Sequence, residues 1–174
     1  VTFKAREGTN SKDQTINVGK RKRFKSLTCR AINASLTGNT RCEYLLCADD
    51  LVSGIEEALN KERLEKLWQT YNTDLKTRKK QGCKELHICT RWSTLDPVGR
   101  LKMINADNPR ARFLVVPALN ENGESNFEYD GGVGFDTAYF NDIKKSMDDI
   151  SFKCLFMGEP VEREGLLYHD DELQ

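Results

Sequence analysis

The chain has 174 residues, of which 38% are hydrophobic, and its 27 basic and 27 acidic side chains cancel. This length predicts one domain with a core of its own. The charges are unevenly spread, because residues 1–120 carry an excess of ten basic side chains and residues 121–174 an excess of ten acidic ones. A polyanion could therefore be bound by the first two thirds of the chain.

The sequence lacks the signals of a membrane protein, of a secreted protein, and of a domain held together by zinc or disulfides. No apolar run approaches the roughly 18 residues of a membrane span, and the N-terminal residues lack the apolar core of a signal peptide. The six cysteines have no CxxC spacing, and Cys47 and Cys89 lie in the most apolar runs. This pattern predicts reduced, buried thiols in a soluble, cytosolic protein.

The N-terminal segment is polar and basic, and a strand signal follows it. Residues 1–23 contain the densest cluster of positive charge, which consists of Lys20, Arg21, Lys22 and Arg23. Such a cluster is typical of a solvated surface, and nucleic-acid contact is the alternative. Over residues 24–32 apolar and polar side chains alternate, which predicts a strand.

Residues 44–77 predict a strand and then a helix. Residues 44–50, "YLLCADD", form an apolar run without alternation that ends in two carboxylates. Such a run predicts a central parallel strand covered on both faces. Over residues 60–77 apolar side chains recur at steps of three and four, which predicts a long helix with Asn60 as its N-cap.

The alternation continues over the next forty residues. Residues 84–90 predict a second buried strand, residues 97–104 a short helix with Pro97 in its first turn, and residues 111–119 a third strand. Strands that alternate with helices are typical of a parallel sheet with crossover helices.

The C-terminal part of the chain lacks this alternation. Residues 120–135 are polar and rich in turn formers, so they predict a long loop with a short strand near Phe127. Two helices are predicted at residues 136–147 and 149–157, and the remaining residues, 158–174, read as a linker that leaves the domain.

Two adjacent carboxylates end the first predicted central strand. Asp49 and Asp50 cost solvation there unless a cation pairs with them, and hydrated Mg²⁺ bound to nucleotide phosphates is such a cation. This is the form of a Walker B element, in which Asp49 holds the metal and Asp50 orients or deprotonates the attacking water. The alternative is that the two acids only cap a helix or a loop.

The second buried strand ends in a polar triplet, Thr90-Arg91-Trp92. Open α/β sheets place their ligand chemistry at the carboxyl ends of strands. In an ATPase with an additional strand beside Walker B, Thr90 would sense the γ-phosphate, and Arg91 would stabilise phosphate or pair with a loop carboxylate. Arg100, on the following helix, is assigned with the basic cluster to DNA contact or coupling. The alternative is that Thr90 caps the next turn and Trp92 fills the core.

Five stretches support a family resemblance: "LTG", "ADDLVSGIEEALNKERLEKLW", "TRWSTLDPVGRL", "VVPAL" and "FMGEPVEREGLLY". Together they resemble the large subunit of the tailed-phage terminase, the motor that packages DNA, over the chain from about Leu27 to its end. Their most specific part is the Thr-Arg-Trp and Asp-x-x-Gly-Arg-Leu combination. The family has a RecA-like ATPase domain followed by a ribonuclease-H-like nuclease domain.

The resemblance implies a three-layer α/β fold and the partners of a packaging motor. Residues 1–158 would be the C-terminal half of the ATPase domain and residues 159–174 the linker towards the nuclease. The motor would use ATP and Mg²⁺, act on double-stranded viral DNA, and form a ring of identical subunits on the procapsid with the portal protein and the small subunit. It would work in the cytoplasm of the bacterial host.

Carried over to this sequence, the family motifs assign the metal to Asp49, the catalytic acid to Asp50 and the coupling of phosphate state to DNA movement to Thr90. The second acid is commonly Glu in such motors, so Asp50 is shorter by one methylene group. No GxxxxGK[ST] phosphate loop occurs in the sequence. We expect that loop upstream of Val1, and we expect little or no ATP hydrolysis by this chain alone.

Two rival interpretations remain open at this point. A non-motor P-loop-type nucleoside triphosphatase or helicase would share the two strand-end motifs, but not the stretches that follow them. A non-catalytic relic or interaction module would use the acids only as caps. A phosphate loop about 80–130 residues upstream in the same reading frame would favour the motor, given the usual size of an α/β ATPase domain.

Overall fold

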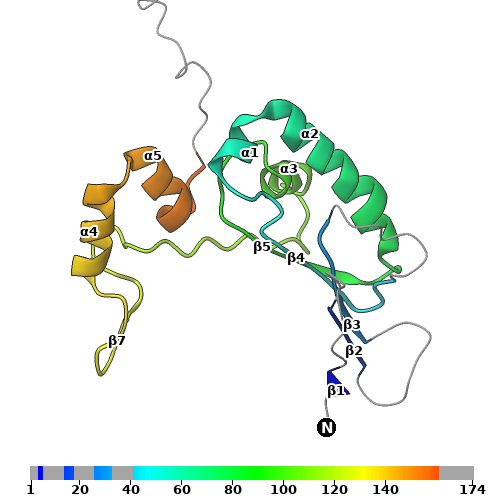
Figure 1. The fold of residues 1–174 in the computed structure, drawn as a ribbon, viewed down its shortest axis with the longest axis horizontal. Coiled ribbons are helices and arrows are strands. Elements are labelled where there is room, and N and C mark those ends of the chain that lie inside the picture. Colours follow the sequence, from blue (N-terminus) through cyan, green and yellow to red (C-terminus); the bar gives the residue numbers. More distant parts are fainter. Residues whose placement is uncertain (1–3, 6–13, 18–25, 33–40, 161–174) are drawn as a thin grey trace, which may run out of the picture. The chain divides into compact units, whose positions relative to one another are not determined.

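The computed structural model describes residues 4–5, 14–17, 26–32 and 41–160 (Figure 1). The chain divides into two compact units, and the boundary between them passes through helix α2 (Lys61–Thr70). The first unit contains Glu65–Ile88 together with the residues up to Leu51, and the second contains Val52–Leu64 and the residues from Cys89 onward.

A parallel pair of strands forms the centre of the first unit. β4 (Leu45–Asp49) and β5 (Lys84–Ile88) lie side by side in a register that places Asp49 opposite Ile88. The prediction that the two apolar runs are neighbouring parallel strands is confirmed. The fold class itself stays a prediction, because one parallel pair is common to many α/β folds.

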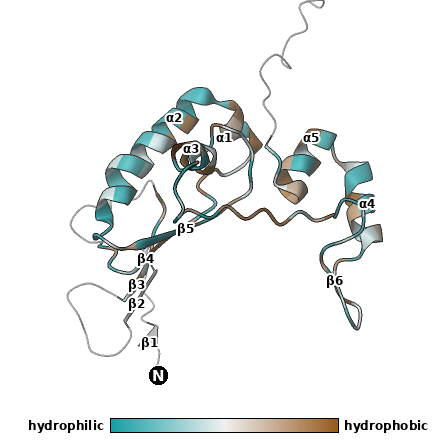
Figure 2. Ribbon diagram, turned by 180° about the vertical axis from the view of Figure 1, so that it is seen from behind, coloured by the Kyte–Doolittle hydropathy of each residue, from teal (hydrophilic) through white to brown (hydrophobic). Residues whose placement is uncertain are grey.

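The predicted long helix is confirmed. α2 continues as a π-helical turn, Tyr71–Leu75, and a 3₁₀ turn, Lys76–Arg78. The Asn60 side-chain oxygen accepts a hydrogen bond of 3.0 Å from the Arg63 backbone N–H, as an N-cap does. Most of α2 is hydrophilic (Figure 2), and its apolar stripe is narrow.

Only one face of the β4–β5 pair is buried. On β4, Leu46 and Ala48 are only 6% and 4% exposed. The β4 side chains that alternate with them, Cys47 among them, point to the opposite face and are exposed. The prediction that both faces are covered, and with it the prediction that Cys47 is buried, is therefore wrong. An apolar run without alternation makes both faces apolar, but it does not supply the element that would cover the second face.

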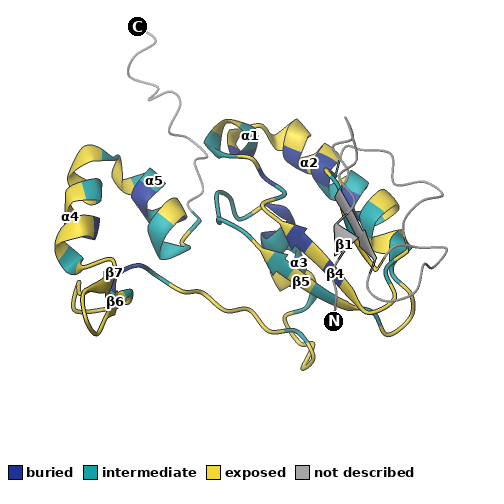
Figure 3. Ribbon diagram, turned by 60° about the horizontal axis from the view of Figure 1, so that its bottom comes forward, coloured by how far each residue is buried: buried dark blue, intermediate teal, exposed yellow. Residues whose placement is uncertain are grey.

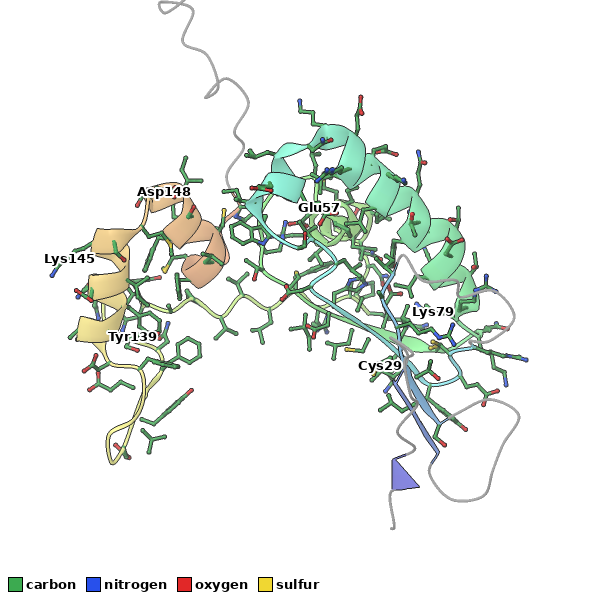
Figure 4. The ribbon with its side chains drawn as sticks, viewed as in Figure 1. Cys29, Glu57, Lys79, Tyr139, Lys145 and Asp148 are labelled. Carbon is green, nitrogen blue, oxygen red and sulfur yellow. The ribbon has the colours of Figure 1, made fainter. Side chains whose placement is uncertain are left out.

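A partly buried polar network ties the helix to β5. The Tyr71 hydroxyl and the Lys79 ammonium both donate to the Glu85 carboxylate, and His87 Nε2 lies 2.7 Å from Glu85 Oε1. Tyr71 is fully buried, and Figure 4 shows Lys79 where the helical segment ends. Burial raises the pKa of Glu85, but hydrogen bonds from His87, Lys79 and Tyr71 outweigh it and lower that pKa to about 2.

This network predicts an acid-sensitive stability for the first unit. Because the pKa of Glu85 is lower in the folded state, its carboxylate stabilises the fold above about pH 4.5, and this contribution is lost as pH falls towards 2. We expect Glu85→Gln to lower the free energy of unfolding at pH 7 by roughly 2–3 kcal/mol. Urea unfolding from pH 7 to pH 2.5 should show this deficit shrinking. The exposed Glu56→Gln is the control, and an equal or pH-independent deficit in both variants would contradict the assignment.

A small antiparallel sheet precedes the parallel pair. β1 (Lys4–Ala5) pairs with β2 (Gln14–Asn17), and β2 pairs with β3 (Leu27–Cys29), which confirms a strand within residues 24–32. The basic cluster from Lys20 to Arg23 lies outside the described residues.

The regular elements of the second unit are mostly helices. It contains α1 (Ile55–Leu59), α3 (Pro97–Ile104), α4 (Thr137–Ser146) and α5 (Asp149–Phe152), which runs on into a π-helical turn, Lys153–Met157. The three predicted helices after residue 90 are confirmed. A core forms around four buried side chains, and partly buried aromatic and aliphatic residues pack on it; its members are Ala118, Leu119, Phe140 and Phe152.

The polar loop carries a short hairpin, and the segment before it differs from the prediction. β6 (Glu128–Tyr129) pairs with β7 (Val133–Gly134), close to the short strand that was predicted. Residues 111–119, predicted as a third strand, pair with no strand in the described part of the chain, apart from an isolated bridge between Leu119 and Ser125. Residues 112–116 are exposed (Figure 3), and the buried core begins at Ala118. Leu114 is 87% exposed. The prediction is wrong because strand propensity alone does not provide a neighbour for the backbone groups.

The helices in the described part of the chain do not have the properties of membrane-spanning helices. None of them combines the length and the apolar character that crossing a membrane requires.

Candidate functional site

The two carboxylates lie at the end of β4, where the chain leaves the sheet. Asp49 is the last residue of β4, and the Asp50 N–H donates a 2.9 Å hydrogen bond to the Ile88 carbonyl at the end of β5. Both aspartates are exposed. Parallel strands thus bring an acidic pair and the end of β5 to one edge, as the sequence predicts.

Asp50 has an unusual backbone conformation. Its φ of 39° is the only positive value among the non-glycine residues that the structure describes. Asp and Asn tolerate the left-handed region better than other side chains because their short polar groups bond locally. A non-glycine residue held in this region at a strand end is an observation that supports a functional role.

The chain then turns into α1. The Ser53 backbone N–H and hydroxyl both donate to Glu57 Oε2, at 2.8 and 2.9 Å. Figure 4 shows Glu57 on this short helix. These bonds engage the Glu57 carboxylate in the start of the helix.

Thr90 and Trp92 belong to the second unit. Thr90 is half-buried, and β5, which the sequence predicts to reach Thr90, ends two residues earlier at Ile88. The Trp92 backbone carbonyl accepts a hydrogen bond from the Cys154 thiol at 3.8 Å, and Cys154 is buried. The triplet is therefore attached to the turn after α5, within the second unit.

Arg91 forms an ion pair with a buried aspartate. Its Nε lies 2.9 Å from Asp96 Oδ2, and the exposed fractions of the two side chains are 14% and 3%. The other oxygen of Asp96 accepts a 2.7 Å hydrogen bond from the Gly99 N–H, so Asp96 is the N-cap of α3. Of the two roles considered for Arg91, this structure contains the pairing with a loop carboxylate.

The Asp-x-x-Gly motif has a steric reason as well as an electrostatic one. A Cβ atom at Gly99 would lie 2.0 Å from the Thr94 backbone oxygen and 2.9 Å from the Arg91 guanidinium. Glycine is required there because the loop before α3 folds back against the helix. Within "TRWSTLDPVG", which contains the loop and the start of α3, Arg91, Asp96 and Gly99 thus depend on one another.

Arg100 supports the same loop. Its Nε donates to the Leu95 carbonyl at 3.0 Å, so its side chain turns back towards the residues before α3. The DNA or coupling role assigned to Arg100 stays a prediction, as do the roles of the four basic residues that lie outside the described part.

A metal ion bound at the end of β4 would have few ligands from the protein. Within the described residues no group of three or more His, Cys, Asp or Glu side chains is placed to hold a metal ion. Mg²⁺ in nucleotide sites keeps several waters and uses one or two carboxylates together with phosphate oxygens. The exposed carboxylate of Asp49 suits that kind of ligation, with Asp50 beside it.

Sequence reasoning missed two features near the strands. The sequence allows two roles for Arg91, and it does not identify Asp96 as the carboxylate with which Arg91 pairs. The polar network of Glu85 and His87 lies in a run that the sequence predicts as a buried apolar strand. The alternation of charged and apolar side chains in "KELHI" is the signal that could have revealed it.

Comparison with known proteins adds no relative, because no family model, curated protein or solved structure matches the chain. The assignment of a family therefore depends on the residues and their geometry.

Proposed function

We propose that this chain is part of the ATPase domain of a phage or prophage DNA-packaging motor, the large subunit of a terminase. The observation that carries the proposal is the acidic end of β4, where Asp49 and Asp50 follow a strand that is parallel and adjacent to β5. An ATPase with an additional strand beside Walker B needs this neighbour relation. In this proposal Asp49 holds Mg²⁺ and Asp50 orients the attacking water, and Thr90, which belongs to the second unit, has the separate role of sensing the γ-phosphate.

The rest of the motor would supply what this chain lacks. The phosphate loop that holds the nucleotide would come from another part of the polypeptide. Double-stranded DNA, the portal protein and the small subunit would be the partners, and a ring of identical subunits on the procapsid would do the work in the bacterial cytoplasm. The ion pair of Arg91 with Asp96 supports a structural role for Arg91 within this proposal.

Thr90→Val in the complete motor tests whether the site belongs to a motor rather than to an ordinary hydrolase. The substitution preserves volume and removes the hydroxyl, so nucleotide affinity should fall by no more than the ~1 kcal/mol of one hydrogen bond. DNA packaging should be lost much more completely, because a nucleotide can drive a conformational change only through contacts that differ between the two conformations. The measurement compares packaging with nucleotide binding in the same preparation.

The control for this test is Thr73→Val, whose hydroxyl donates to the Gln69 carbonyl on an exposed helical turn. It should leave both packaging and binding unchanged. If packaging and binding fall in parallel in Thr90→Val, or if neither falls, the coupling role of Thr90 is wrong.

A further inference from the structure

Two cysteines lie where the strands of the first unit begin. Cys42 precedes β4 by three residues, and Cys83 is the residue directly before β5. Both side chains are half-buried, and both are free thiols. Asp49 is at the other end of β4, so the cysteine pair shares no residue with the proposed ATPase site.

Backbone hydrogen bonds hold the two cysteines beside each other. The Cys42 carbonyl accepts a 2.8 Å hydrogen bond from the Lys80 N–H, and the Lys80 carbonyl accepts one of 2.9 Å from the Cys83 N–H. Lys80 and Cys83 are thus the ends of a β-turn, whose Cα atoms lie less than about 7 Å apart. The next N–H, that of Lys84, donates to the Tyr44 carbonyl at 2.9 Å. The chain around Cys83 therefore runs alongside the segment that begins with Cys42.

The distance between neighbouring strands suits a disulfide. Disulfide-bonded cysteines have Cα atoms about 4.4–6.8 Å apart, and neighbouring strands are spaced about 4.8 Å apart. Burial raises the pKa of the Cys42 thiol, and the nearby Cys83 raises it further, against a lowering by Lys79. One thiol can act on the charge of another only when the two side chains are close. The two cysteines are therefore a pair rather than two isolated thiols.

We propose that Cys42 and Cys83 form a reversible disulfide when the chain meets a small anionic disulfide of the glutathione class. One cysteine thiolate attacks the oxidant, which leaves a mixed disulfide and releases one glutathione thiolate. The second cysteine then displaces the other glutathione thiolate. The two glutathione thiolates take up the protons of the two cysteines, so the chain loses two electrons and the oxidant gains them.

The charges next to the pair favour an anionic oxidant. Within four residues of either cysteine, the charged side chains are Arg41, Glu43, Lys79, Lys80, Lys84 and Glu85. Lys79 and Glu85 form an ion pair with each other, so the other three basic residues and one acidic residue leave a net charge of +2. Glutathione disulfide is an anion at neutral pH, and a positive local potential raises the concentration of such a reactant near the site.

The exchange begins at Cys83. Cys42 is a poor nucleophile near neutral pH, because its raised pKa keeps its thiol protonated. Cys83 therefore carries the mixed disulfide, and Cys42 resolves it. Cys42→Ser should stop the reaction at that stage, with one glutathione attached to Cys83, whereas Cys83→Ser should lose most of the reaction at Cys42.

The disulfide closes a loop that contains β4 and α2. A cross-link between residues that are already adjacent in the folded chain stabilises mainly by restricting the unfolded chain. For this loop of about forty residues, the urea midpoint of unfolding should rise by about 1–2 M on oxidation. Reduction with dithiothreitol should return the midpoint to its original value.

Mass spectrometry after exposure to glutathione disulfide tests the proposal. Trypsin releases Cys42 on the peptide 42–61, which also contains Cys47, so the experiment uses the 174-residue chain with Cys47→Ser. The main product should be this peptide joined to the peptide that contains Cys83, and dithiothreitol should separate the two. In the same background, Cys42→Ser and Cys83→Ser should abolish the link. Cys89→Ser is the matched control, because Cys89 lies directly after β5 and should leave the yield unchanged.

Three results would overturn the proposal. They are a folded chain in which the two cysteines stay unlinked, a link that forms as readily in the urea-denatured chain, and an oxidised chain that unfolds at a lower urea concentration than the reduced one. Far-ultraviolet circular dichroism verifies that each serine variant is folded. The experiment needs no nucleotide or DNA, so failure here leaves the proposed function untouched, and failure of that function leaves the disulfide untouched.

Discussion

Asp50→Asn in the complete motor is expected to reduce ATP turnover by about 10² to 10⁴, the usual effect of removing a positioned acid or base. The amide keeps the size and the hydrogen-bonding oxygen of the carboxylate, but it cannot accept the proton of the attacking water. Asn also tolerates the positive φ that Asp50 adopts, so the chain should leave β4 in the same way. Steady-state ATPase rates, with thermal unfolding measured in parallel, provide the comparison.

Two further variants complete that experiment. Asp49→Ala should lower turnover to a similar extent and should also raise the Mg²⁺ concentration required, because it removes the proposed metal ligand. Asp74→Asn, at an exposed acid on the helical turn after α2, should leave turnover unchanged. Near-normal turnover in Asp49→Ala or Asp50→Asn would reassign the pair to a structural role.

Asp96→Ala is expected to lower the free energy of unfolding of the second unit by about 3–5 kcal/mol, which is typical when one partner of a buried ion pair is removed. The substitution leaves the Arg91 guanidinium, which is 14% exposed, without its carboxylate, and α3 loses its N-cap. Asp136→Ala is the matched control, since Asp136 caps α4 in the same geometry but is exposed. It should cost only about 1 kcal/mol.

A double-mutant cycle separates the ion pair from the cap. In Arg91→Ala/Asp96→Ala the uncompensated charge is gone, so the double variant should be more stable than Asp96→Ala alone. Urea unfolding of the four proteins gives the coupling energy. Additive effects of the two substitutions would mean that Asp96 acts as a cap and that Arg91 is free to serve another ligand.

The helices and the parallel neighbours could be predicted from the sequence because their signals are local. The spacing of apolar residues, the helix caps and the strand ends can each be recognised from a few neighbouring residues of the sequence. Asn60 and Pro97, for example, mark the starts of α2 and α3 as expected. In contrast, the segment that covers a sheet face and the partner of a third strand can lie far away in the sequence. Cys47 and the segment around Leu114 therefore differ from the prediction, since no short window says which part of a protein packs on them.

The candidate site shows the same division. Asp49 and Asp50 could be placed at the end of a strand because the charge follows the apolar run directly. The partner of Arg91 could not be chosen, because a guanidinium five residues before an aspartate is equally compatible with an anion from outside. Only the folded loop, with Gly99 packed against the Thr94 carbonyl, shows that Asp96 and Arg91 meet.

The exposed segment before the second-unit core has a practical consequence for handling the protein. Phe113, Leu114, Val115 and Val116 form a short, exposed run of high strand propensity without charge, and in the described part of the chain no strand pairs with it. Arg112 and Pro117 flank it and act as gatekeepers against such pairing. Overexpression at 37 °C should therefore favour inclusion bodies, and Val115→Lys should increase the soluble yield without altering the folded core.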